Sequence, residues 1–110
     1  MLKTRIALVI LVAATPLFAQ SKMANDLSRL SAILLDSQNT KVTISAEAWK
    51  VTGNEAAALA NRIAASSKQK AARDLQMHVK LMRDAAVSGD AATARSHAAE
   101  ALPLAYQLTK

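Results

Sequence analysis

The stretch AARDLQMHVKLMRDAAVSGDAATARSHAAEALPLAYQL, residues 71–108, predicts two antiparallel helices joined by a short turn. Apolar residues recur every three or four positions on both sides of Ser88-Gly89-Asp90. Gly89 suits the left-handed position that follows a helix, and Asp90 is a good N-cap for the next helix. Pro103 should kink that second helix. Its buried face is expected to comprise Ala94, Ala98, Ala101, Ala105 and Leu108.

Two further helices are predicted upstream. The first should run from about Met23 to Asp36, with Leu27, Leu30 and Leu34 on one stripe. Residues 37–44 are polar and turn-prone, and we expect them to form a loop. Ser45 is a good N-cap for the next helix. The apolar stripe of that helix contains Trp49, Thr52, Ala56, Leu59 and Ile63.

Gly53 lies inside this stripe, where close helix packing is a better explanation than a ligand role. A capping box with Ser66 as the cap and Gln69 reaching back predicts a turn at 65–67, although one bent helix is an open alternative. The apolar stripe of the following helix is expected to contain Ala71, Leu75, His78, Met82 and Ala85. Four helices with short connections predict an all-α, up-down-up-down four-helix bundle.

The N-terminus has the pattern of a cleaved signal peptide over residues 1–19. Lys3 and Arg5 precede a nine-residue apolar run that is too short to span a bilayer, and Ala19 offers a cleavage site. Residues 20–110 would then form a single domain that is periplasmic or secreted. Their formal charge is +4, because the leader removes two cations from the total of +6. Export argues against nucleic acid as a partner, and no transmembrane segment is expected in the mature chain.

The composition of residues 20–110 predicts a thin core. These residues contain 21 alanines but only 17 Leu, Ile and Val together, and alanine buries little area. The chain has no cysteine, so packing alone, or packing together with a partner, must hold the domain together. Completing the core by forming a homodimer is one structural hypothesis.

His78, Met82 and His97 are candidate metal ligands. With the turn centred near Gly89, residues whose numbers sum to about 179 should face each other, which pairs Met82 with His97. His78 lies one helical turn from Met82. Thioether and imidazole groups suit soft copper, and a Met–His pair is able to hold a haem iron. The alternative is structural, with Asp74 hydrogen-bonded to His78 and Met82 filling the core.

The stretch from Ala94 to Leu102, followed by Ala105-Tyr106, resembles the last helix of the small soluble b-type cytochromes of the periplasm. The resemblance covers only the last helical pair. In that family a histidine ligand follows the tyrosine, whereas this chain has Gln107. The haem function is therefore not transferred to this chain.

Arg73, Lys80 and Arg83 form a basic stripe that is able to contact an acidic protein or an anionic envelope surface. A solvated face with Asp84 paired to Lys80, and Asp74 paired to Lys70, is the structural alternative. No catalytic motif is present, and the acids are scattered. The sequence thus favours an exported, non-enzymatic binding module of the cell envelope without a cofactor. A copper- or haem-binding bundle is the alternative.

Overall fold

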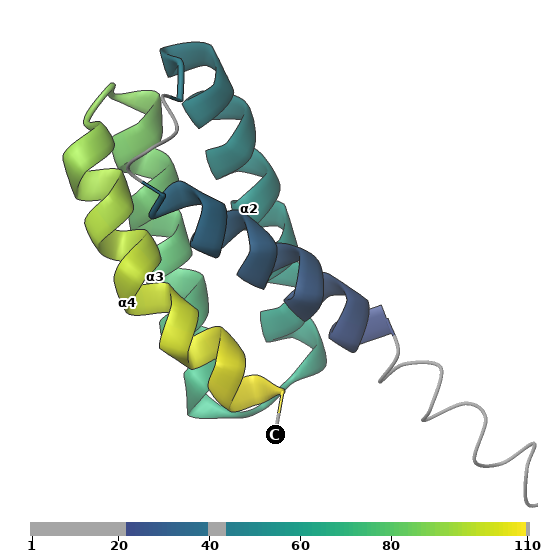
Figure 1. Ribbon diagram of the computed structural model, residues 1–110. Helices are drawn as coiled ribbons and strands as arrows, with labels where there is room; N and C mark the ends of the chain where they lie inside the picture. Colours follow the sequence, from purple (N-terminus) through teal and green to yellow (C-terminus); the bar gives the residue numbers. More distant parts are fainter. Residues whose placement is uncertain (1–21, 40–43, 110) are drawn as a thin grey trace, which may run out of the picture.

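A computed structural model describes residues 22–39 and 44–109. Within these residues the chain forms helices over 22–37, α2 (Ala46–Ser66), α3 (Lys70–Val87) and α4 (Ala91–Leu108), and no strand. The chain reverses direction from each helix to the next, as the colours of Figure 1 show. The described part is therefore an all-α four-helix bundle. The predicted signal peptide lies outside the described residues, as do residues 40–43 of the expected loop.

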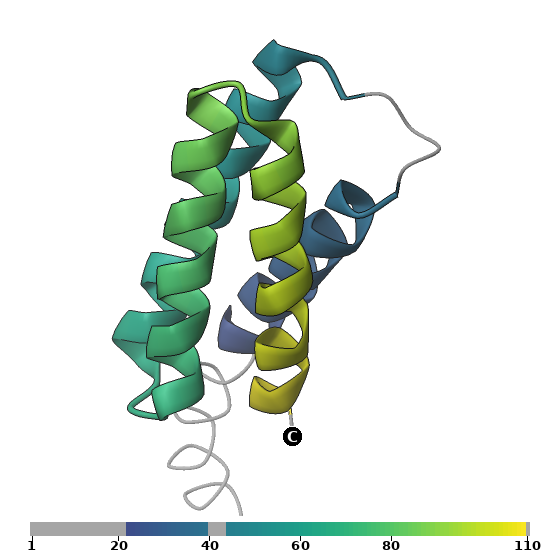
Figure 2. The same cartoon turned by 90° about the vertical axis from the view of Figure 1, so that its left-hand side faces the viewer.

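The first helix, residues 22–37, agrees closely with its predicted bounds. It lies inclined to α4 rather than parallel to it (Figure 2). Leu27, Leu30 and Leu34 are at most 2% exposed, so the predicted stripe does face the core. None of the helices described here is both long enough and apolar enough to cross a membrane.

Three predicted helix boundaries are confirmed. The Ser45 hydroxyl accepts a hydrogen bond from the Ala48 backbone N–H at 3.2 Å, which caps α2. Asp90 caps α4 by accepting from the Thr93 backbone N–H at 3.1 Å. Gly89 has a φ of 85°, a conformation that a side chain disfavours. Gly89 and Asp90 together set the reversal between α3 and α4.

The predicted capping box between α2 and α3 is wrong. Ser66 is still helical, and Ser67 is the residue that leaves the helix with extended backbone angles. The Ser67 hydroxyl therefore accepts from the Gln69 N–H at 3.2 Å, and Gln69 becomes the N-cap without a side-chain bond of its own. The turn lies at 67–69 instead of 65–67, and α2 and α3 are two separate helices.

The core differs from the prediction mainly on α3. This helix contacts both α2 and α4, so it buries a wider face than one stripe. Val79 is completely buried, whereas the His78 side chain is 20% exposed at the border of that face. On α4 the five expected residues are all buried, and the helix continues through Pro103 to Leu108. The α3 face comprises Ala71, Ala72, Leu75, Val79, Met82, Ala85 and Ala86.

Two ion pairs hold the first helix against α2. Arg62 donates two hydrogen bonds to Asp26, at 3.2 and 3.0 Å, and Arg29 lies 2.6 Å from the Glu55 carboxylate. The hydrogen bonds from Arg62 lower the pKa of the Asp26 carboxyl below its usual value. A lowered pKa means that this pair stabilises the fold at neutral pH.

We expect the stabilisation from Asp26 to disappear as the pH falls through the lowered pKa of its carboxyl, below the ordinary value of 3.8. At neutral pH, Asp26→Asn should melt at a lower temperature than the wild type, and the difference should shrink to zero in strong acid. Thermal melts followed by circular dichroism between pH 7 and pH 2 measure this difference. A gap that stays constant with pH would show that the charge of Asp26 contributes nothing.

Candidate metal centre

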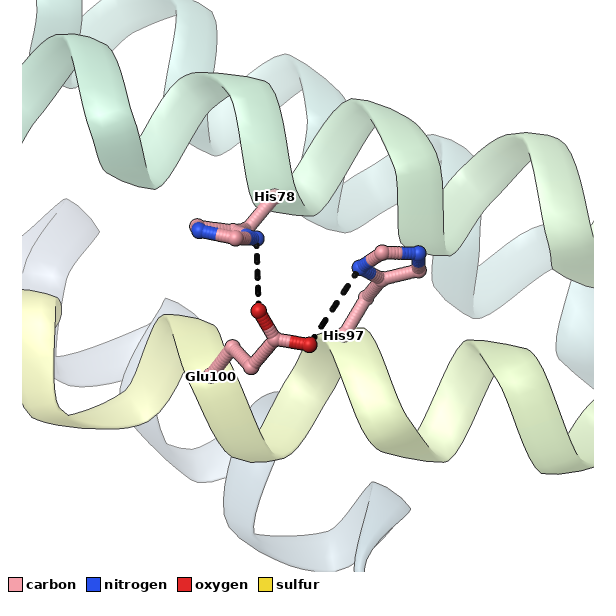
Figure 3. Close-up of side chains that lie close together, drawn as sticks. All are labelled: His78, His97 and Glu100. Atoms are coloured by element: carbon pink, nitrogen blue, oxygen red, sulfur yellow. Dashed lines mark ion pairs between the residues drawn. The ribbon is translucent and has the colours of Figure 1, made fainter.

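Three side chains converge between α3 and α4: His78 from α3, and His97 and Glu100 from α4 (Figure 3). The His78 Nδ1 lies 3.5 Å from one Glu100 oxygen, and the His97 Nδ1 lies 3.8 Å from the other. The two imidazole rings have centroids 6.0 Å apart. One potential ligand atom from each residue lies within 4.8 Å of the other two.

The hairpin explains why these residues meet. The tight turn at Gly89 aligns α3 and α4 in antiparallel register, and this register places residue 100 opposite residue 79, next to His78. His97 and Glu100 are three residues apart and therefore share one face of α4. Small buried residues such as Ala98 and Ala101 let the two backbones approach closely. The position of the cluster thus depends on the α3–α4 hairpin and its turn at Gly89.

The two Nδ1 atoms are buried and lack a hydrogen-bond partner among the described residues. Their distances to Glu100 fall within ion-pair range, but the geometry is not that of hydrogen bonds. The histidine side chains are about one fifth exposed, at 20% and 22%, while that of Glu100 is 51% exposed. Buried polar atoms usually have partners, so these two nitrogens, which face one carboxylate without a hydrogen bond, are candidate ligand atoms.

The spacing is slightly too wide for a bound ion as it stands. A Zn²⁺ ion with ligands at about 2.1 Å in tetrahedral geometry needs ligand atoms about 3.4 Å apart. The ligand atoms lie within 4.8 Å of one another, so the side chains must close by up to about 1.4 Å. Glu100 is long and half exposed, so rotation about its side-chain bonds is able to shorten its distances to the histidines, whereas rotation of the imidazoles must close the gap between the two nitrogens.

The structure brings together two of the three predicted ligands, His78 and His97. Met82 is completely buried and belongs to the hydrophobic core cluster. Asp74 makes no hydrogen bond to His78 in the part of the chain described, and the ion-pair partner of His78 is Glu100 instead. Glu100 was missed by the sequence reasoning. Its spacing from His97 and the register rule were both signals that pointed to it.

The predicted basic stripe lies along a groove of about 490 Å³ between α2 and α3, which Arg73, Lys80 and Arg83 all line. The expected pair between Asp84 and Lys80 is wrong. The Asp84 carboxylate is instead paired with Arg83, at 2.9 Å. Two guanidinium nitrogens of Arg83 donate hydrogen bonds to it.

Comparisons with protein-family models, with curated proteins and with solved structures find no match for this chain. Its function is therefore argued from its own residues.

Proposed function

We propose that this protein is an exported, non-enzymatic helical bundle that reversibly binds a divalent transition-metal ion through His78, His97 and Glu100. One observation carries the proposal: two buried, unpartnered imidazole nitrogens face the same carboxylate across the α3–α4 hairpin. A bound ion would give both nitrogens a partner and neutralise the carboxylate.

The ligand set favours Zn²⁺ or Cu²⁺ over the soft copper suggested by the sequence. Soft Cu(I) prefers sulfur, and the thioether of Met82 belongs to the core. Two imidazoles and one carboxylate are ligands of borderline divalent ions, and Zn²⁺ accepts three protein ligands with a water in the fourth position.

The surroundings favour reversible binding over catalysis. The half-exposed Glu100 leaves one side of the cluster open to solvent, so an ion is able to enter and leave. In the part of the chain that is described, no fourth His, Asp or Glu joins the cluster to activate a bound water. An accessible three-ligand site in an exported bundle suits metal binding or sensing in the cell envelope.

Calorimetric titration with Zn²⁺ and with Cu²⁺ tests the proposal. The protein is recovered from the periplasm and freed of metal. If the leader has been removed, its intact mass should be that of a chain that starts at Gln20. It should bind one equivalent of ion, and its melting temperature should rise with ion concentration. An excess of 100 times Kd stabilises the native state by about 2.7 kcal/mol. Removing the ion with EDTA should reverse the rise.

Four variants identify the ligands. His78→Ala and His97→Ala should each weaken binding at least about 100-fold, because a three-ligand site has none to spare. Glu100→Gln should weaken binding by a smaller factor, since the amide oxygen is still able to coordinate weakly. Met82→Leu is the matched control one turn further along α3, and it should bind normally. Loss of binding in Met82→Leu alone would instead support the thioether site, and no binding by the wild type would refute the proposal.

A further inference from the structure

The groove between α2 and α3 is a second surface whose chemistry the metal centre does not use. It lies on the side of α3 that faces α2, whereas His78 points toward Glu100 of α4 (Figure 3). Arg73 and Lys80 are exposed and make no ion pair with any described residue. Among the residues that line the groove there is no carboxylate. A hollow with two free cations, and with a counter-charge only on Arg83 through Asp84, attracts an anionic ligand.

The groove also offers hydrogen-bonding and apolar contacts. Gln76 donates a hydrogen bond to the Asn61 side-chain oxygen at 2.9 Å, which leaves the Asn61 amide nitrogen as a donor in the groove. Met77 is 51% exposed and lies between Arg73 and Lys80 in sequence. A large exposed apolar side chain flanked by cations suits a ligand with both acidic and apolar groups.

We propose that this groove binds an acidic segment of a partner protein, with an apolar residue of the segment against Met77 and its carboxylates on Arg73 and Lys80. The spacing of Arg73 and Lys80 along α3 fits an extended peptide. Residues seven positions apart on a helix are about 10.5 Å apart along its axis. An extended polyproline-type peptide advances about 3.1 Å per residue, so carboxylates three residues apart, on one face, are about 9 Å apart.

The shape argues against a membrane as the occupant. The cations line a hollow between two helices, and a flat bilayer contacts raised surfaces rather than recessed ones. Membrane-binding helices also present a wide apolar face, whereas the groove offers one exposed methionine. This inference is independent of the metal proposal, because His78, His97 and Glu100 do not line the groove.

Fluorescence anisotropy of the full chain with a labelled peptide of four Glu-Leu-Pro repeats tests the proposal. The peptide should bind at low salt, and a Gln-Leu-Pro version should not. The double variant Arg73→Gln/Lys80→Gln should bind the peptide about tenfold more weakly. This factor corresponds to the combined binding free energy of two modest ion pairs. The control Lys50→Gln/Lys68→Gln removes the same charge outside the groove and should bind as the wild type does.

Three outcomes would overturn the proposal. Equal weakening in both double variants would mean that only net charge matters. Failure of the wild type to bind the acidic peptide would exclude an acidic segment. Cosedimentation with phosphatidylglycerol vesicles that is lost in Arg73→Gln/Lys80→Gln, without peptide binding, would assign the groove to lipid. His78→Ala should bind the peptide normally, which separates this result from any failure of the metal site.

Discussion

Trp49→Ala should destabilise the protein by about 3–5 kcal/mol, the cost of truncating a buried large aromatic residue. Trp49 is 4% exposed and begins the buried face of α2. The Arg95 guanidinium of α4 lies 5.9 Å from the centre of its ring, so the indole connects two helices that are not adjacent in sequence. Among the described residues, 11 of the 21 buried apolar side chains are alanines, and such small side chains fill little of the cavity that an indole leaves.

The expected loss is comparable to the whole stability of a domain of this size. Trp49→Ala should therefore be partly unfolded at room temperature, as measured by circular dichroism in a guanidinium titration. Val51→Ala is the control, because Val51 lies in the same turn of α2 but is 67% exposed. Its effect should stay within about 0.5 kcal/mol. If Trp49→Ala melts within a degree or two of the wild type, the indole does not contribute to the core.

The helices and their ends follow from local chemistry and were therefore predictable. The caps at Ser45 and Asp90 and the left-handed Gly89 each act within a few residues, so sequence alone identifies them. The alanine face of α4 follows from helical periodicity in the same way. The error at Ser66 arose because two adjacent serines offered equivalent caps, and the difference between them depends on where α2 stops packing.

The arrangement of the helices depends on contacts that periodicity does not describe. A stripe shows which face of a helix is buried, but not the neighbour that buries it or the angle between them. The inclination of the first helix is one such feature (Figure 2). The second contact face of α3 is another, and it explains why Val79 is buried while His78 remains at the border.

The candidate site was only partly predictable, because periodicity shows which face of a helix is buried but not what that face contacts. The hairpin register correctly brought His78 and His97 to one region of the molecule. Met82 was chosen as the third ligand because it lies on the same stripe, yet that stripe is what buries it. Glu100 reaches the cluster because it lies at the edge of the α4 face, where a side chain is able to meet both histidines and solvent.

Gly53→Val should be destabilising by about 3 kcal/mol or more, because α2 and α3 are in backbone contact at this position. A Cβ added to Gly53 would lie 3.1 Å from the Cα of Arg83 and 3.3 Å from the Cβ of Ala86. Neither atom is able to rotate away, so the helices must separate. Gly53→Ala should cost only about 1 kcal/mol, because alanine also gains up to about 1 kcal/mol in helix propensity.

Chemical denaturation of the two variants measures these differences, with Asn54→Val as the control for β-branching at an exposed position of α2. Asn54→Val should cost only a few tenths of a kcal/mol. Equal stability of Gly53→Val and Asn54→Val would show that α2 and α3 do not touch at Gly53.

Arg83 both contacts Gly53 and lines the basic groove, so separating the helices should also displace a cation of that groove. Gly53→Val should therefore weaken binding of the acidic peptide under conditions where it remains folded, while leaving the α3–α4 metal centre able to bind its ion.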